Sequence, residues 1–287
     1  MQSFNNEAYE LLLTDLINDA FYANTSNRGK IAKIRQCAEV VMRRILVIPP
    51  TQRITLGCDI VIDGVNMINN HILTNARKII NSDGNASTHT QDLTQKTDAD
   101  VKRAVDALFD LYAYLLIAFF EKYAFGTNPS IMTKFSLLPP IIRYKVLTYL
   151  YDKHPDNVDV IDKLALAILK SKNKEDALSW VESNKDRFNG MSSVTNEGRT
   201  SIISQFGQQI GQQIIDSSPT MYDLCIDKIN KVGNDTNRIV YNDFESALPH
   251  YKEHGRLSET TQDEIEFNSI MEFLYLGRKE SIAIISE

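Results

Sequence analysis

Residues 98–125, DADVKRAVDALFDLYAYLLIAFFEKYAF, carry the strongest helical pattern of the chain. Apolar side chains recur in this segment at the spacing of a helix with a buried face. At its centre lies an apolar run of ten residues, 111–120, closed by Asp110 and Glu121. A helix needs about 20 apolar residues to cross a bilayer, so the segment predicts a buried helix and no membrane partner. Its apolar surface is wider than one buried stripe, which predicts a homodimer or burial against a larger partner.

Apolar periodicity predicts further helices on both sides of this segment. Before it, helices are expected over residues 7–22, 30–46 and 66–81, whereas residues 54–65 fit either a short strand or the start of a helix. After it, helices are expected over residues 139–153, 157–171, 174–187, 199–216, 219–231 and 259–276. The chain has only 12 Gly and 8 Pro, fewer than sandwiches and barrels usually need for their turns. We therefore predict an all-α fold with more than about 60% helix.

The segment Gly126-Thr127-Asn128-Pro129 predicts a domain boundary. Glycine often follows the last turn of a helix, and proline cannot continue one. A chain of 287 residues is long enough to bury two modest cores. We expect a helical domain over residues 1–126 and a helical-repeat-like domain over residues 127–287.

Residues 155–182, PDNVDVIDKLALAILKSKNKEDALSWVE, contain the one clear internal motif of the second domain. Leu164 and Ala165 place a leucine and a small residue on its first helix, and Ala177 places a small residue on its second. Small residues let two helices approach closely. The segment resembles a tetratricopeptide repeat, which implies helical hairpins that hold another protein, such as a component of a larger complex.

A second motif, Gly84-Asn85-Ala86-Ser87-Thr88-His89, lies in a polar stretch, residues 81–97, that is expected to connect two helices. Upstream, Arg35 and Glu39 lie one turn apart on the expected second helix. Together with the long helix 98–125, these features resemble the HEPN superfamily over about residues 7–125. The closest pattern is the GNxxxH branch found in restriction and phage-defence proteins. The resemblance implies a four-helix lobe that pairs with a second copy.

The ribonucleases of that superfamily cut RNA without a metal, using an arginine, usually followed by a polar residue such as asparagine, and a histidine. The resemblance implies that the histidine moves a proton while the arginine stabilises the phosphate charge. Asn85 and His89 match this motif, but Gly84 stands where the arginine should be. Arg35 or Arg77 is then the substitute guanidinium. The candidate site residues are Arg35, Glu39, Asn85 and His89.

The same residues also have a structural interpretation. Asn85 and His89 can hydrogen-bond their loop to Glu39 and fix the geometry of the lobe. A Gly-Asn pair also fits a turn with positive φ at Gly84. Both interpretations remain open at the level of sequence.

The charge of the chain is unevenly distributed. The formal net charge is −6, yet residues 28–53 contain seven basic residues and one acid, Glu39. This segment could meet phosphate, or it could form a solvated helix face whose charges acids elsewhere balance.

Cysteines and histidines give no metal or redox motif. Cys37, Cys58 and Cys225 are widely spaced, without a CxxC pair, which indicates a reducing compartment. His250 and His254 share a helical face and could hold Zn²⁺, but no third ligand is evident, so no metal and no cofactor are expected. The polar N-terminus does not resemble a signal peptide, and a cytoplasmic location is expected.

The resemblance to the HEPN superfamily, with the arginine missing at Gly84, implies a non-catalytic role in prokaryotic antiviral defence or in a toxin system. The chain would bind RNA or a nucleotide, or act as a regulatory adaptor. The alternative is a metal-independent HEPN-type endoribonuclease. The missing arginine at Gly84 separates the two.

Overall fold

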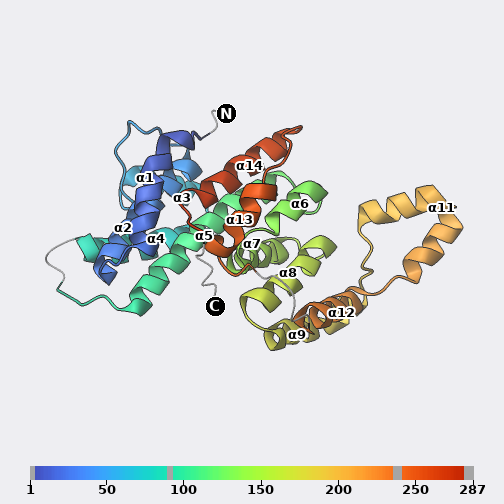
Figure 1. Cartoon of the computed structure of the whole chain (residues 1–287). Helices are drawn as coiled ribbons and strands as arrows, with labels where there is room; N and C mark the ends of the chain where they lie inside the picture. The colour runs from blue at the N-terminus through green and yellow to red at the C-terminus, as the bar shows by residue number, and fades with distance from the viewer. Residues whose placement is uncertain (1–3, 89–92, 235–240, 281–287) are drawn as a thin grey trace, which may run out of the picture. The chain divides into compact units, whose positions relative to one another are not determined.

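The computed structural model describes residues 4–88, 93–234 and 241–280. The described residues form fourteen α-helices and no β-strand, with one isolated bridge between Ser192 and Thr220. Helix makes up 74% of the residues that the structure describes, and Figure 1 shows the succession of helices. The predicted all-α fold is therefore confirmed. Among the residues that the structure describes, no helix is both long enough and apolar enough to cross a bilayer.

The chain divides into two compact units. The first comprises residues 1–122 and 244–287, and the second comprises residues 123–243. The predicted division after residue 126 placed everything that follows in a second domain. The structure differs because the last helices of the chain belong to the first unit.

The first unit is built around three helices, α2, α4 and α5, that pack against one another in pairs. Its elements are η1 (Glu7–Tyr9), α1 (Glu10–Ile17), η2 (Asn18–Tyr22), α2 (Asn27–Leu46), α3 (Asp59–Ile68), α4 (His71–Thr88), α5 (Asp98–Lys122), α13 (Phe244–His254) and α14 (Gln262–Tyr275). The segment that fitted either a strand or a helix contributes to helix α3. The polar stretch 81–97 was expected to be a connection, but α4 continues through its first part to Thr88.

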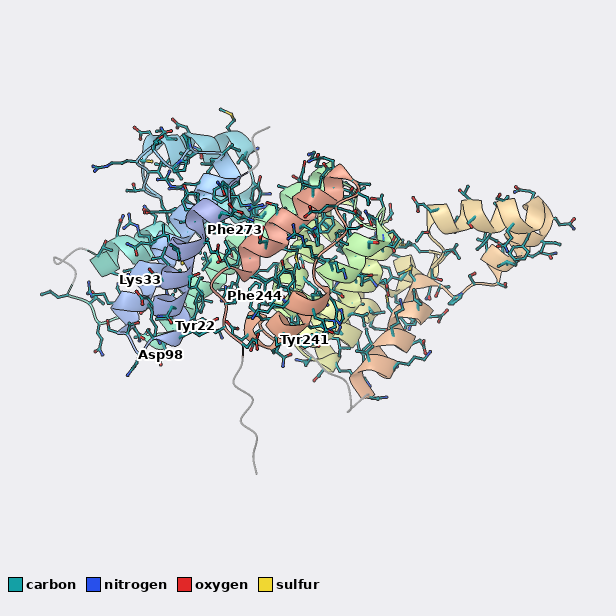
Figure 2. The ribbon with its side chains drawn as sticks, turned by 45° about the horizontal axis from the view of Figure 1, so that its top comes forward. Tyr22, Lys33, Asp98, Tyr241, Phe244 and Phe273 are labelled. Carbon is teal, nitrogen blue, oxygen red and sulfur yellow. The ribbon has the colours of Figure 1, made fainter. Side chains whose placement is uncertain are left out.

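Helices α13 and α14 cover the surplus apolar surface of α5. Phe267 of α14 lies 5.4 Å from Phe119, measured between ring centroids. Phe244 of α13 (Figure 2) lies 6.1 Å from Phe109 and 6.3 Å from Tyr112. Helix α5 does bury more than one apolar stripe, as predicted, but the helices that cover this surface belong to the same chain. It therefore gives no reason to expect a second copy at α5.

The second unit contains paired helices. Its elements are α6 (Pro129–Phe135), α7 (Pro140–Lys153), α8 (Val158–Ser171), α9 (Lys174–Ser183), α10 (Lys185–Asn189), α11 (Asn196–Asp216) and α12 (Met221–Asn234). Helix α8 packs against α7, α9 and α12. Leu164, Ala165 and Ala177 are each no more than 2% exposed, as close packing at small residues requires.

Asparagine side chains fix where three of these helices begin. Asn128, Asn157 and Asn173 precede α6, α8 and α9, and each accepts a hydrogen bond from a backbone N–H of the first turn. Such caps satisfy donors that have no partner within the helix. The turn residues of the repeat-like segment thus have a direct structural role.

Helix α11 departs from the expected single helix. Gly207 has a φ of 77°, outside the helical region, and divides α11 into two arms. The sequence pattern missed this break because apolar residues continue at helical spacing on both sides of the glycine.

Candidate functional site

Three of the four predicted site residues lie together where α2 meets α4. Arg35 and Glu39 come from α2, and Asn85 comes from the last turn of α4. His89, the fourth, lies outside the described residues. The described part of the site is therefore an arginine, a carboxylate and an amide.

Arg35 joins the two helices. Its Nη1 donates a hydrogen bond to Asn85 Oδ1 at 2.5 Å and lies 3.4 Å from Thr88 Oγ1. Its Nε lies 3.5 Å from Glu39 Oε1, one turn along the same helix. The Arg35 side chain is only 13% exposed. The guanidinium is thus held by neighbours on both helices and has little access to solvent.

Gly84 lies beneath the Arg35 side chain. A Cβ added at Gly84 would lie 2.9 Å from the Cβ of Arg35 and 3.0 Å from its Cγ. Gly84 is within α4 and is not among the glycines with positive φ. The interpretation of a turn at this glycine was therefore wrong. The residue is small because a side chain from α2 crosses its backbone.

Glu39 supplies a carboxyl group to the described part of the site. Burial raises the pKa of its carboxyl group, and the Arg35 charge, a hydrogen bond with the Leu56 backbone and the Arg43 charge oppose that rise. A carboxyl with a raised pKa can act as a general acid or base. The same environment also suits a carboxylate that only anchors a neighbouring arginine.

Arg77, the other predicted source of a guanidinium, faces elsewhere. Its Nη1 donates to the Leu56 carbonyl oxygen at 2.9 Å, and the residue is only 9% exposed. Arg35 is therefore the arginine beside Asn85.

Other arginines also secure α4. Arg28 Nη1 donates to the Ala86 carbonyl oxygen at 2.9 Å, close to the C-terminal end of α4. Arg103 of α5 makes two hydrogen bonds of 2.9 Å to the Asp83 carboxylate. The end of α4 that carries the motif is thus tied to α2 and to α5.

Much of the basic segment 28–53 makes contacts within the unit. Lys33 pairs with Asp19 at 3.1 Å, and Arg43 donates to the Pro49 carbonyl oxygen at 2.9 Å. Arg44 is deeply buried, and this burial lowers its pKa to about 10. Several of the basic side chains that could have bound phosphate therefore have partners within the unit. This favours the interpretation that the charges of segment 28–53 are balanced inside the fold.

Arg44 illustrates this internal role. Its Nη1 donates to Asn6 Oδ1 at 2.6 Å, and its Nη2 donates to Ser269 Oγ at 3.0 Å. Its guanidinium carbon lies 4.8 Å from the centre of the Phe273 ring. A cation stacked and bonded in this way joins α2 to α14.

We compared the chain with models of protein families, with curated proteins and with solved structures. No match was found in any of the three. The resemblances to the HEPN superfamily and to tetratricopeptide repeats therefore remain predictions.

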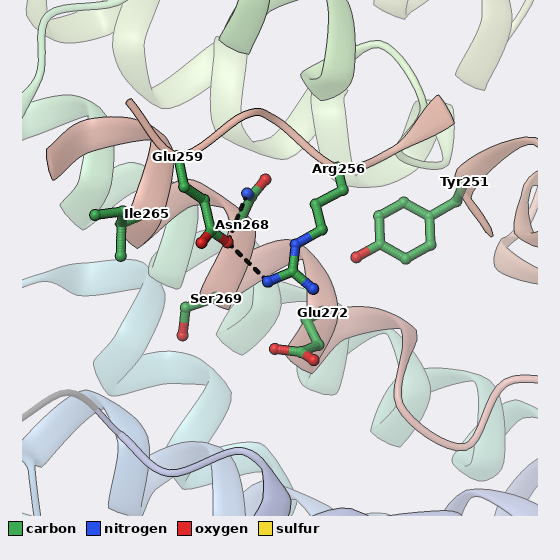
Figure 3. A pocket seen from close by; sticks show the side chains of 7 residues that line it. All are labelled: Tyr251, Arg256, Glu259, Ile265, Asn268, Ser269 and Glu272. Carbon is green, nitrogen blue, oxygen red and sulfur yellow. Dashed lines mark hydrogen bonds and ion pairs between the residues drawn. The ribbon is translucent and has the colours of Figure 1, made fainter. Parts of the chain in front are cut away.

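A second cluster lines a cavity that the sequence did not indicate. The cavity has a volume of about 160 Å³ and is shown in Figure 3. It is lined by Tyr251, Arg256, Glu259, Ile265, Asn268, Ser269 and Glu272. The polar lining comes from α13 (Tyr251), from the segment between α13 and α14 (Arg256 and Glu259) and from α14 (Asn268, Ser269 and Glu272). No spacing in the sequence indicates that these residues meet.

Three of the polar side chains that line the cavity, Arg256, Glu259 and Asn268, are joined by hydrogen bonds. Glu259 Oε1 accepts from Arg256 Nη2 at 2.9 Å and from Asn268 Nδ2 at 3.0 Å. Asn268 also bonds both backbone groups of Leu257. Glu259 has a φ of 60°, an uncommon conformation for a residue with a side chain. These bonds hold a loop in place against α14.

His250 and His254 lie together on α13, with ring centroids 4.7 Å apart. Within the part of the chain that the structure describes, no group of three or more potential ligands gathers as a metal site would require. The pair therefore does not extend to a recognisable metal site among those residues.

Proposed function

We propose that this chain is a non-catalytic adaptor, a helical protein that acts by binding other proteins. One observation carries the proposal. The position where the HEPN ribonucleases have an arginine is a glycine covered by Arg35, so no side chain fits there without a shift of α2 or α4. The setting, prokaryotic antiviral defence or a toxin system, is what the resemblance implies.

The bonding of Arg35 supports a structural role. Stabilising a phosphate requires guanidinium donors that point at the ligand before it arrives. In this chain Asn85 and Glu39 already engage the guanidinium. A phosphate that bound through Nη1 or Nε would have to compete with Asn85 or Glu39. A group engaged in this way stabilises the contact between two helices and is poorly prepared for catalysis.

The helices of the second unit also support the proposal that the chain binds other proteins. Paired helices such as α7, α8 and α9 form surfaces that bind other proteins in repeat folds. The basic segment is largely occupied by internal partners, which favours a protein partner over RNA.

One observation favours the alternative, a metal-independent endoribonuclease. Arg35 brings a guanidinium to within 2.5 Å of Asn85, so a positive group lies beside the motif despite Gly84. The raised pKa of Glu39 adds a possible proton carrier.

The two functions separate in a paired experiment on Glu39→Gln and Asn85→Ala. RNA cleavage and the melting temperature are measured for each variant and for the wild type. The adaptor predicts no cleavage by any of them and a lower melting temperature for Asn85→Ala. Cleavage by the wild type that is lost in a variant with an unchanged melting temperature would favour the ribonuclease.

A further inference from the structure

Helix α11 is a hairpin of two short arms. Residues 196–206 form the first arm and residues 208–216 the second, with the turn at Gly207 (Figure 1). A Cβ added at Gly211 would lie 2.9 Å from the Cα of Ile203, so the arms touch where a glycine lets them approach. The two glycines of the repeated GQQ unit thus have different roles, one at the turn and one at the contact.

The base of the hairpin is fixed to the second unit. The Ser193 N–H donates to the Pro219 carbonyl oxygen at 3.1 Å, and the Met221 N–H donates to the Met191 carbonyl oxygen at 2.8 Å. Ile215, near the base, is only 2% exposed. The hairpin is therefore held at its base and presents its distal part to solvent.

The distal part combines exposed apolar side chains with a complete lack of charge. Phe206 is 46% exposed and Ile210 is 55% exposed. Residues 200–215, TSIISQFGQQIGQQII, are sixteen consecutive residues without Asp, Glu, Lys or Arg. About a quarter of the whole chain is charged, at 24%, so an uncharged exposed segment of this length is unusual for this protein. Solvated helices normally carry charges on their outer face.

We propose that the hairpin is a self-association module, in which the α11 arms of two copies pack into a four-helix bundle. The chemistry of the segment identifies a second copy as the occupant. In a symmetric dimer each surface meets itself, so any charge placed near the axis meets a like charge. The chain carries a net charge of −6, and the uncharged segment 200–215 of the hairpin avoids that repulsion.

The polar side chains of the hairpin fit the same partner. Five glutamines lie between residues 205 and 213. Each glutamine amide both donates and accepts hydrogen bonds, so a glutamine surface is complementary to a copy of itself. Phe206 and Ile210 supply the apolar contact that a bundle needs at its centre.

A lipid surface fits the segment less well. Helices that lie on membranes carry Lys and Arg on their polar face to meet anionic headgroups. The hairpin has neither between residues 200 and 215, and the net charge of the chain is negative. The second copy is therefore the better match.

The size of the hairpin limits the affinity. Arms of this length extend over roughly 13 to 16 Å at 1.5 Å per residue, so the bundle would be short. Such a contact falls at the low end of specific interfaces, for which dissociation constants on the order of micromolar are typical. The dimer should therefore form and dissociate over an accessible range of protein concentration.

Sedimentation velocity of the full chain, over about a hundredfold range of concentration around micromolar, tests the proposal. The wild type should shift from monomer to dimer. The double substitution Phe206→Ser and Ile210→Ser should raise the dissociation constant at least about tenfold, with an unchanged helical spectrum. The matched control is Met67→Ser, which removes an 87% exposed apolar side chain from the first unit and should leave the dimer intact.

A second measurement does not depend on affinity. Ile210→Cys should give a covalent dimer with a bismaleimide linker when Cys58, which is half-buried, is replaced by Ser in both the variant and its control; Cys37 and Cys225 are buried. A monomeric wild type at the highest concentration would overturn the proposal, as would a dimer that persists in the double variant. Flotation of a monomeric wild type with vesicles of phosphatidylcholine and phosphatidylserine, lost in the double variant, would assign the hairpin to lipid instead.

Discussion

Arg35 lies so close to Gly84 that a methyl group on the glycine would be 2.9 Å from the arginine Cβ. This contact explains why the residue before Asn85 is a glycine in a helix where other residues would be more stable. The guanidinium of Arg35 comes from α2 and is already bonded to Asn85.

Gly84→Ala should lower the free energy of unfolding by about 1 to 3 kcal/mol, because overpacking outweighs the roughly 1 kcal/mol that alanine gains in a helix. The matched control is Gly29→Ala on α2, where an added Cβ meets its nearest neighbour at an ordinary 3.4 Å. The control should be neutral or stabilising in urea denaturation. Equal effects of the two substitutions would contradict the close contact.

Gly84→Arg restores the arginine of the ribonuclease motif and should not create RNA cleavage. The larger side chain has to displace Arg35, so the melting temperature should fall further than in Gly84→Ala. Cleavage by a folded Gly84→Arg variant would show that the lobe keeps a competent site and would favour the ribonuclease.

Asn85→Ala should cost about 1 to 3 kcal/mol of unfolding free energy, since it removes a hydrogen bond to a charged and largely buried group. Asn85→Asp should recover most of that loss, because a carboxylate also accepts from Arg35. Urea denaturation of both variants checks this. A harmless Asn85→Ala would mean that the contact contributes nothing to stability.

The raised pKa of Glu39 predicts that the stability of the fold depends on pH. Burial raises the pKa of the folded carboxyl above its ordinary value of 4.5, so the folded state binds a proton more tightly than the unfolded state. The contribution of Glu39 to stability is therefore largest at low pH. It decreases as the pH rises from about the ordinary pKa through the raised pKa.

The measurement is the difference in melting temperature between Glu39→Gln and the wild type, taken at several pH values. Glutamine does not titrate, so the variant should gain relative to the wild type as the pH rises through this window. A difference that runs in the opposite direction would mean that the Arg35 charge outweighs burial.

Arg278 should anchor the C-terminal segment to the first unit. Its side chain is 1% exposed, its Nη1 lies 3.5 Å from Glu245 Oε1 of α13, and its guanidinium carbon lies 4.7 Å from the centre of the Phe21 ring in the N-terminal part of the unit. Arg278→Ala should cost about 3 to 5 kcal/mol, since it leaves a partly buried carboxylate without its cation. Arg278→Met, which keeps the apolar stem, should cost less. A stable Arg278→Ala in thermal unfolding would contradict the assignment of residues 244–287 to this unit.

The sequence predicted where the helices lie better than it predicted which helices pack against one another. The apolar period of α5 and the small residues Ala165 and Ala177 are local features of the sequence. The structure has α5 as a helix with buried apolar residues, and it buries both alanines. Helix α13 was missed because Pro249 and a polar composition conceal it. The return of α14 to α5 depends on Phe119 meeting Phe267, a contact between distant segments that no local period reports.

The candidate site was predicted in part for the same reason. Arg35 and Glu39 are neighbours on one helix, so their pairing follows from spacing alone. The contact of Arg35 with Gly84 depends on how α2 crosses α4. A glycine followed by asparagine resembles a turn unless that crossing is known, and the sequence therefore suggested the wrong backbone.

The most direct test of the non-catalytic proposal is the cleavage of single-stranded and structured RNA by the purified chain, with EDTA present and with His89→Ala as the comparison. The account predicts that the wild type and His89→Ala give the same background, at protein concentrations where both are folded. Cleavage by the wild type that disappears in a His89→Ala variant of unchanged melting temperature would contradict it.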